Sequence, residues 1–189
     1  MKTTNIMIVG VGGQGSLLAS KLLGNLLSDE GYDVKVSEVH GMSQRGGSVV
    51  TYVRFGEKVY SPIVDRGEAD FIVAFEKIEA ARYASCLKPD GRIIVNTQEI
   101  DPMPVITGAA EYPHGALDTL SSLGLSVDAL DALTPATEAG SAKAVNIVLM
   151  GRLSKYMDIP EEKWTEAIKK SVAPKFVEMN LRAFELGRK

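Results

Sequence analysis

The chain has 189 residues, of which 45% are hydrophobic and 24% charged, and its formal net charge is −3. This length suits one domain, here expected over residues 1–189, and the charge balance with no basic stripe argues against nucleic acid or a membrane surface as a partner. The single cysteine, Cys86, excludes an internal disulfide and a self-contained iron–sulfur cluster, which usually needs four thiolates; we expect it to be a small packed residue.

The first part of the chain predicts a β-α-β unit followed by a hairpin. Residues 5–9 form a short apolar run that ends in glycines, which indicates a buried strand. Leucines spaced four apart predict a helix over residues 14–28, and a strand over residues 34–39 completes the unit. Residues 48–54 are rich in Val, Thr and Tyr and predict a strand that returns as a hairpin through residues 59–61.

The rest of the chain continues the alternation of strands and helices. Residues 70–75 and 92–96 predict two more buried strands, joined by a helix over residues 79–87 that Lys88-Pro89-Asp90-Gly91 ends. Two prolines within residues 100–107 confine any strand there to a sheet edge. The last predicted elements are a strand over residues 125–130 and helices over residues 113–123, 139–156, 161–172 and 175–186. We therefore expect an α/β fold, a three-layer α/β/α sandwich with a mostly parallel, mixed sheet and a Rossmann-like start.

The first candidate site is the loop Gly10-Val11-Gly12-Gly13-Gln14-Gly15, between a predicted strand and a predicted helix. Glycines there permit close approach of a phosphate, which the free N–H groups of the helix start can bind. The same loop also suits tight strand–helix packing without a ligand. A dinucleotide site would need an acid at the end of the second strand, where Glu38 stands, but the polar, glycine-rich residues 40–47 that follow are unusual for an NAD-binding unit.

The second candidate site is Ser43-Gln44-Arg45-Gly46-Gly47, where the second predicted strand leaves the sheet. Sheet topology places this loop near the first one. An arginine among short polar residues can bind a phosphate or a carboxylate through two parallel hydrogen bonds. The alternative is a solvated loop with a surface arginine.

Together the two loops resemble the gamma domain of pyruvate/2-oxoacid:ferredoxin oxidoreductases. The form His40-Gly41-Met42-Ser43-Gln44-Arg45-Gly46-Gly47 resembles in particular the beta subunit of the indolepyruvate type. Asn96-Thr97, the segment from Pro102 to Pro104, Lys143-Ala144-Val145-Asn146 and the end of the chain match as well, so the resemblance covers nearly all of it.

The resemblance implies a reaction and a division of labour. An arylpyruvate is decarboxylated on thiamine diphosphate, two electrons pass through iron–sulfur clusters to ferredoxin, and the acyl group goes to coenzyme A. A large alpha subunit carries thiamine diphosphate, Mg²⁺ and [4Fe-4S] clusters, so we expect this chain to bind no cofactor or metal alone and to be inactive when isolated. It lacks a Gly-Asp-Gly element with a downstream asparagine, the usual magnesium–diphosphate element of thiamine enzymes.

The implied site residues of this chain lie mainly on the two loops. Arg45 is the candidate catalytic residue, and it can contact the thiamine diphosphate, the oxoacid carboxylate or a coenzyme A phosphate. The candidate cofactor-binding residues are Gly10, Gly12, Gly13, Gln14, Gly15, Glu38, Ser43, Gln44, Gly46, Gly47 and Asn96.

Five other polar residues have alternative interpretations. Glu76 and Asn96 stand at the carboxyl ends of two predicted strands, where they either face a cleft or cap the following chain. Asn146 is expected to hold a neighbouring loop through hydrogen bonds. His40 adjoins the second loop, and His114 is expected to be a surface residue.

Three other functions remain open on the residues alone. One is a gamma subunit for pyruvate or a branched-chain 2-oxoacid, another a free-standing NAD(P)- or FAD-binding protein, and the third a non-catalytic interaction module. No apolar run approaches the about 18 residues of a spanning helix, and the first residues do not read as a signal peptide, so we expect a cytoplasmic protein.

Overall fold

The computed structural model describes residues 3–41 and 46–189, which form one mixed six-stranded sheet with the order β2-β3-β1-β4-β5-β6. β1, β4, β5 and β6 run parallel, whereas β3 pairs antiparallel with both β1 and β2. This confirms the predicted mixed sheet. The strands are β1 (Thr4–Val11), β2 (Asp33–His40), β3 (Ser48–Gly56), β4 (Ala69–Ala74), β5 (Leu87–Asn96) and β6 (Ser126–Leu130).

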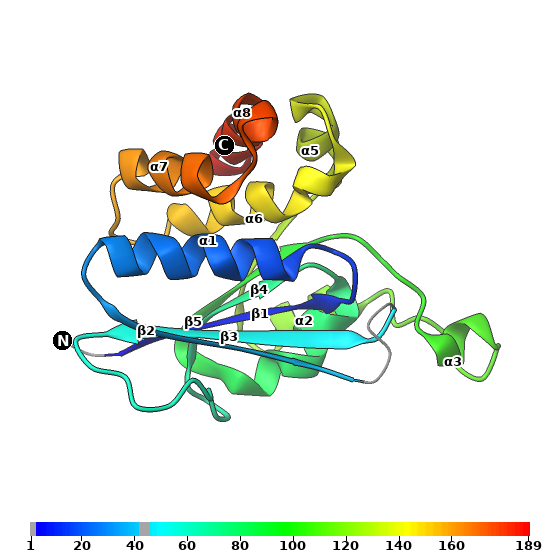
Figure 1. The fold of residues 1–189 in the computed structure, drawn as a ribbon. Coiled ribbons are helices and arrows are strands. Elements are labelled where there is room, and N and C mark those ends of the chain that lie inside the picture. The colour runs from blue at the N-terminus through cyan, green and yellow to red at the C-terminus, as the bar shows by residue number, and fades with distance from the viewer. Residues whose placement is uncertain (1–2, 42–45) are drawn as a thin grey trace.

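Helices cover both faces of the sheet and complete the predicted three layers (Figure 1). On one face α1 (Ser16–Asp29) and α6 (Val145–Ser154) contact the sheet, and α5 (Leu133–Ala139), α7 (Glu161–Ser171) and α8 (Val177–Arg188) pack on the outer side of these two helices. The other carries α2 (Lys77–Tyr83) and α4 (Ala116–Ser122). A short helix, α3 (Met103–Ile106), lies on an arm that projects from the end of the sheet.

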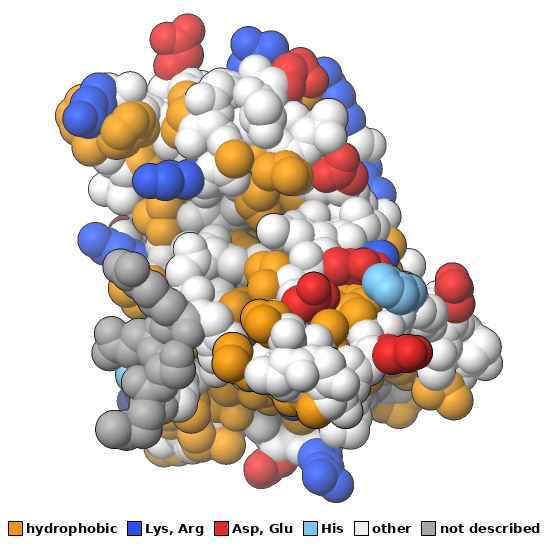
Figure 2. All heavy atoms as spheres, turned by 90° about the vertical axis from the view of Figure 1, so that its right-hand side faces the viewer, with side chains coloured by type: hydrophobic (Ala, Val, Ile, Leu, Met, Phe, Trp, Pro, Cys, Tyr) orange, Lys and Arg blue, Asp and Glu red, His pale blue; other side chains and the backbone are white. Residues whose placement is uncertain are grey.

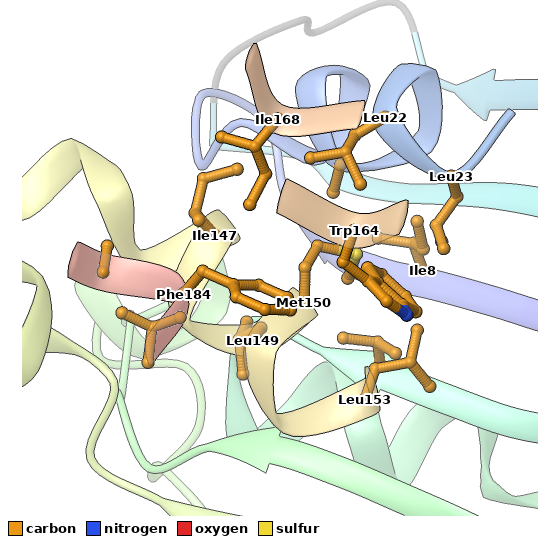
Figure 3. Close-up of a cluster of buried hydrophobic side chains, with 14 of the residues drawn as sticks. Ile8, Leu22, Leu23, Ile147, Leu149, Met150, Leu153, Trp164, Ile168 and Phe184 are labelled. Atoms are coloured by element: carbon orange, nitrogen blue, oxygen red, sulfur yellow. The ribbon is translucent and has the colours of Figure 1, made fainter. Parts of the chain in front are cut away.

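Side chains alternate between two cores along each central strand, as the period of a strand requires. On β1, Ile6 and Ile8 face the larger core, whereas Met7 and Val9 face the core under α2. The larger core contains the only tryptophan, Trp164, whose ring stacks on Phe184 with 5.9 Å between centroids (Figure 3). These apolar contacts fix α1 and α6 against the sheet, and both helices begin at the end where the parallel strands finish.

Several predicted elements differ from the structure. Residues 59–61 form no strand because β1 and β2 already occupy both edges of β3. Residues 100–107 contain the helix α3 instead of an edge strand, and β5 begins at Leu87, five residues before the predicted start. The predicted helix over residues 139–156 begins only at Val145, because Gly140, with φ 126°, ends the unpredicted helix α5.

Asp33, the first residue of β2, ties the chain after β3 to this strand. Its carboxylate accepts hydrogen bonds from the Lys35 ammonium and from the Val59 N–H, the latter at 2.9 Å. These bonds, led by the one from Lys35, lower the pKa of Asp33 from 3.8 to about 2. A lowered folded-state pKa stabilises the fold above the unfolded value, and this stabilisation is lost as the pH falls from about 4 through about 2.

We expect the Asp33 carboxyl carbon, followed by NMR, to titrate near pH 2, and Lys35→Met to move that midpoint toward the ordinary value because the main hydrogen bond is lost. A midpoint near 3.8 in the unaltered chain would contradict the contact with Lys35.

Candidate functional site

The first glycine loop is closed by its own glutamine. Gln14 Oε1 accepts a hydrogen bond from the Val11 N–H at 2.7 Å, and Gln14 Nε2 donates to the Phe75 carbonyl at 3.1 Å and to Gln98 Oε1 at 3.3 Å. Gly10 must be small here, since a Cβ on it would lie 2.9 Å from both Gln14 Oε1 and Phe75 Cβ. The loop is therefore a preformed turn joined to the end of β4.

The two glycine loops touch each other. The Gly12 N–H donates to the Gly47 carbonyl at 2.8 Å, and the Gly46 N–H donates to the Gly12 carbonyl at 3.3 Å. β1 and β3 are neighbours whose pairing ends with Val11 opposite Ser48, so the loops continue this ladder. The prediction that the loops lie together is confirmed for Gly46 and Gly47.

Ser43, Gln44 and Arg45 lie outside the described residues. Their predicted roles, and that of Arg45 above all, stay predictions.

The described end of the second loop is also joined to α2. Ser48 Oγ donates to the carboxylate of Glu79, which is only 4% exposed and also accepts from Arg82 Nε at 3.1 Å. The half-exposed Arg82 lines a small cavity together with Gly46. Sequence reasoning missed Glu79 and Arg82, because nothing in a helix-like segment indicates that it will meet a loop more than 30 residues earlier.

Asn146 holds the first loop to α6, as predicted. Its Nδ2 donates to the Gly15 carbonyl at 3.2 Å, and its Oδ1 accepts from the Ile147 N–H at 2.8 Å. Gly15 has φ 90°, a left-handed conformation that favours glycine, and a Cβ on it would lie 2.8 Å from Asn146 Nδ2. The starts of α1 and α6 are therefore held in close contact.

Glu76 caps α2, as one of its two interpretations predicts, and it also lines the small cavity beside Gly46 and Arg82. Its Oε2 accepts from the Glu79 N–H at 3.0 Å at the start of α2, and its Oε1 accepts from the Tyr112 hydroxyl and the Ile100 N–H. Burial, together with the hydrogen bond to Glu76, raises the pKa of Tyr112. Because Ile100 and Tyr112 flank α3, one buried carboxylate anchors both ends of the projecting arm.

Asn96 is also buried and fully engaged. Its Nδ2 donates to the Phe75 carbonyl and to Gln98 Oε1, both at 3.3 Å, and its Oδ1 accepts from the Ala132 N–H at 3.0 Å. Gln14 Nε2 donates to the same Phe75 carbonyl and Gln98 Oε1. The side-chain amides of Gln14 and Asn96 therefore join the ends of β4 and β5. A direct ligand contact for Asn96 stays a prediction.

Two clefts flank the first glycine loop. The one toward β2, about 380 Å³, is lined by Gly12, Gly13 and Leu17 together with Glu38 and His40; we call it the β2 cleft. Glu38 is exposed and accepts a hydrogen bond from Thr51 Oγ1 at 3.3 Å, and His40 is exposed with Nδ1 3.0 Å from the Gly41 carbonyl oxygen.

The second cleft, about 580 Å³, lies toward α6, and we call it the α6 cleft. Its lining includes Gly13, Gly15, Gln98, Lys143 and Asn146. Figure 2 looks onto the end of the molecule where α3 projects, and shows hydrophobic side chains exposed over the middle of this face with acidic side chains beside them. In the sequence, Lys143 stands out only as part of the motif Lys143-Ala144-Val145-Asn146, which predicts no role for its side chain.

His114 is on the surface, as predicted, with its side chain 74% exposed and its Nδ1 2.9 Å from Glu99 Oε2.

The part of the chain that the structure describes holds no group of three His, Cys, Asp or Glu side chains placed to bind a metal. Within these same ranges, no helix has both the length and the apolar character needed to cross a bilayer.

Residues 5–189 match the sequence model of the pyruvate ferredoxin/flavodoxin oxidoreductase family. The chain belongs to this family. It is 48% identical to indolepyruvate oxidoreductase subunit IorB of Thermococcus kodakarensis, over 100% of this chain and 96% of that one. The protein of the same name from Archaeoglobus fulgidus is 39% identical over 97% and 92% of the two chains. The common gamma subunit of the pyruvate/ketoisovalerate oxidoreductases of Pyrococcus furiosus is 26% identical over 92% and 89%.

Solved structures that are less than 25% identical share the fold. The gamma subunit of a keto/oxoacid ferredoxin oxidoreductase from Geobacter sulfurreducens superposes with a TM-score of 0.72 at 22% identity, over 97% of this chain and 95% of that one. A 2-oxoglutarate:ferredoxin oxidoreductase from Magnetococcus marinus gives 0.74 at 21% identity, over 100% of this chain but 31% of that one. The family match and the curated relatives confirm the resemblance of the two loops to this family, and a free-standing nucleotide-binding protein is not favoured.

Proposed function

We propose that this chain is the small subunit of an indolepyruvate-type 2-oxoacid:ferredoxin oxidoreductase and completes the active site of a larger subunit. The observation that carries the proposal is the 48% identity, over the whole chain, to a protein named as an indolepyruvate oxidoreductase subunit. Relatives named for 2-oxoglutarate and for pyruvate are 32% and 26% identical, which favours the indolepyruvate type over the alternative gamma subunits.

The sequence of this chain does not fit the cofactors of such a reaction, since it lacks the Gly-Asp-Gly element with a downstream asparagine that usually binds magnesium and the diphosphate of thiamine. A [4Fe-4S] cluster needs several thiolates, and the sequence contains one cysteine. We therefore assign thiamine diphosphate, Mg²⁺ and the clusters to the partner subunit, where thiamine diphosphate would stabilise the carbanion formed on decarboxylation. Ferredoxin would take electrons from the complex, and coenzyme A would accept the acyl group; the related 2-oxoglutarate enzyme is described with coenzyme A bound.

In this proposal the contribution of the chain is the pair of glycine loops. Gln14 and the contacts between Gly12, Gly46 and Gly47 hold the loops together, and Asn146 holds the first loop against α6. A loop fixed before binding loses little entropy when a ligand arrives, so it is suited to position an anionic substrate or cofactor beside the partner. Arg45 would supply a planar, two-pronged contact to a carboxylate or phosphate.

The test is turnover of the complex reconstituted with Arg45→Ala. Loss of a charge-assisted contact to a desolvated anion costs about 1.5–3 kcal/mol, so we expect kcat/KM to fall about ten- to a hundredfold. Arg45→Lys should restore only part of the loss, because lysine lacks the planar fork. The assay is oxoacid-dependent reduction of an artificial electron acceptor.

Arg182→Ala is the matched control. Arg182 forms an exposed ion pair with Glu138, with both side chains more than half exposed, and its loss should leave kcat/KM unchanged. Unaltered kcat and KM in the Arg45→Ala complex would show Arg45 to be a surface residue and the second loop to have no catalytic part.

A further inference from the structure

We propose that an anionic group of the ligand, distinct from the one proposed for Arg45, binds in the α6 cleft rather than in the β2 cleft, with Lys143 as its cationic contact. A dinucleotide interpretation of the loop would predict the opposite side, where the acid at the end of β2 holds a ribose. The inference rests on the proposed function only for the identity of the ligand; the choice of side follows from the charges and volumes of the two clefts.

Among the residues that the structure describes, the two clefts carry opposite charges. The described lining of the β2 cleft includes the exposed carboxylate of Glu38 and no lysine or arginine. The described lining of the α6 cleft includes Lys143 and no aspartate or glutamate. A phosphate or carboxylate is repelled by Glu38 and attracted by Lys143, and this difference is larger inside a cleft than in open water.

The Lys143 ammonium has no counterion within the described residues. Other lysines of the chain do form ion pairs, for example Lys77 with Glu99 at 2.8 Å and Lys163 with Glu30 at 3.0 Å. No salt bridge of Lys143 occurs among the residues that the structure places, and its side chain is exposed. Its charge is therefore available to a ligand in the cleft.

The backbone that carries Lys143 is fixed on both sides. Ser141 Oγ accepts a hydrogen bond from the Lys143 N–H at 3.2 Å and caps the short 3₁₀ turn Ala142–Ala144. Three residues later, Asn146, which is 4% exposed, binds the Gly15 carbonyl. The stem of Lys143 thus starts from a position tied to the glycine loop, which lowers the entropy lost on binding.

The α6 cleft has room for more than the anion. Beside it lies another, mainly apolar cleft of about 560 Å³. This cleft shares Leu18, Lys143 and Asn146 with the α6 cleft and extends to Val172, Phe176 and Met179. The ligand class that fits is therefore a phosphate or carboxylate joined to an uncharged, partly apolar body. Lys143 stands where the two parts of such a ligand would meet.

The test is an NMR titration of the ¹⁵N-labelled chain alone with inorganic diphosphate, and in a second arm with pyruvate, which separates a phosphate site from a carboxylate site. We expect saturable amide shifts at Gly13, Gly15, Ala142 and Lys143 in at least one arm, and about tenfold weaker binding in Lys143→Gln. Lys143→Arg should bind like the unaltered chain because it keeps the charge. Lys169→Gln removes a lysine from the exposed face of α7 and should change nothing.

Three outcomes would overturn the inference: shifts centred on His40 and Val49 with tighter binding in Glu38→Gln, equal binding by Lys143→Gln and the unaltered chain, or no saturable shifts in either arm. Turnover of the complex tests the proposed function separately. A complex that turns over normally while Lys143→Gln binds diphosphate and pyruvate unchanged would overturn the anion site alone.

Discussion

Gly151→Ala and Gly187→Ala should each lower the free energy of unfolding by about 3 kcal/mol or more, near or above the upper end of ordinary overpacking. A Cβ on Gly151 in α6 would lie 2.2 Å from the Phe184 carbonyl oxygen, and one on Gly187 in α8 would lie 2.0 Å from the Val148 carbonyl oxygen. Both obstacles are backbone atoms of the facing helix, so relief requires the two helices to separate. That separation would also disturb Trp164 and Phe184, which stack beside this contact.

The measurement is urea unfolding followed by the fluorescence of Trp164, the only tryptophan. Gly24→Ala is the matched control, because Gly24 also lies within a helix but its added Cβ would meet only Val36 Cγ2 at 3.6 Å, an ordinary contact. It should be neutral or stabilising by up to about 1 kcal/mol. If Gly151→Ala unfolds at the same urea concentration as Gly24→Ala, α6 and α8 are not in the contact described.

Gly15→Ala should destabilise the chain by about 2 kcal/mol or more and lower the turnover of the complex. Two costs combine: alanine is strained at φ 90° by about 1–2 kcal/mol, and its Cβ would lie 2.8 Å from Asn146 Nδ2. Since Asn146 Nδ2 donates to the Gly15 carbonyl, the clash falls on the bond that joins the first glycine loop to α6. The site and the fold are therefore affected together.

Gly13→Ala separates the two costs. Gly13 also has a positive φ, 104°, but nothing lies within 4 Å of its added Cβ, so this variant carries the backbone strain alone. A double-mutant cycle of Gly15→Ala with Asn146→Ala should recover the part of the loss that is due to the clash. Equal unfolding free energies for Gly13→Ala and Gly15→Ala would contradict the clash between an added Cβ at Gly15 and Asn146 Nδ2.

The elements that the sequence predicts well are those with a local pattern. The buried strand β1 and the leucine stripe of α1 each depend on short-range periodicity, and both lie within two residues of their expected ends. Helix α5 has no such stripe and contains Pro135, so local pattern does not reveal it. The placement of β3 between β2 and β1 depends on long-range pairing, which is why the expected hairpin partner at residues 59–61 was wrong.

The candidate site divides in the same way. Its two glycine loops are visible in the sequence because glycines cluster in a strand-to-helix connection and after the second strand. The residues that support them are not visible: Glu79 and Asn146 are 31 and 131 residues from the loop atoms they bind. Only the folded chain shows that Lys143 faces the loop from the α6 side.

Whether this chain completes a catalytic complex can be measured by reconstitution with its large partner. Indolepyruvate- and coenzyme A-dependent reduction of an artificial acceptor should be near background for either subunit alone. It should rise as this chain is added and level off at a fixed subunit ratio, with pyruvate a poorer substrate. Full activity of the large subunit without this chain, or iron-dependent absorbance and turnover in this chain alone, would contradict the account.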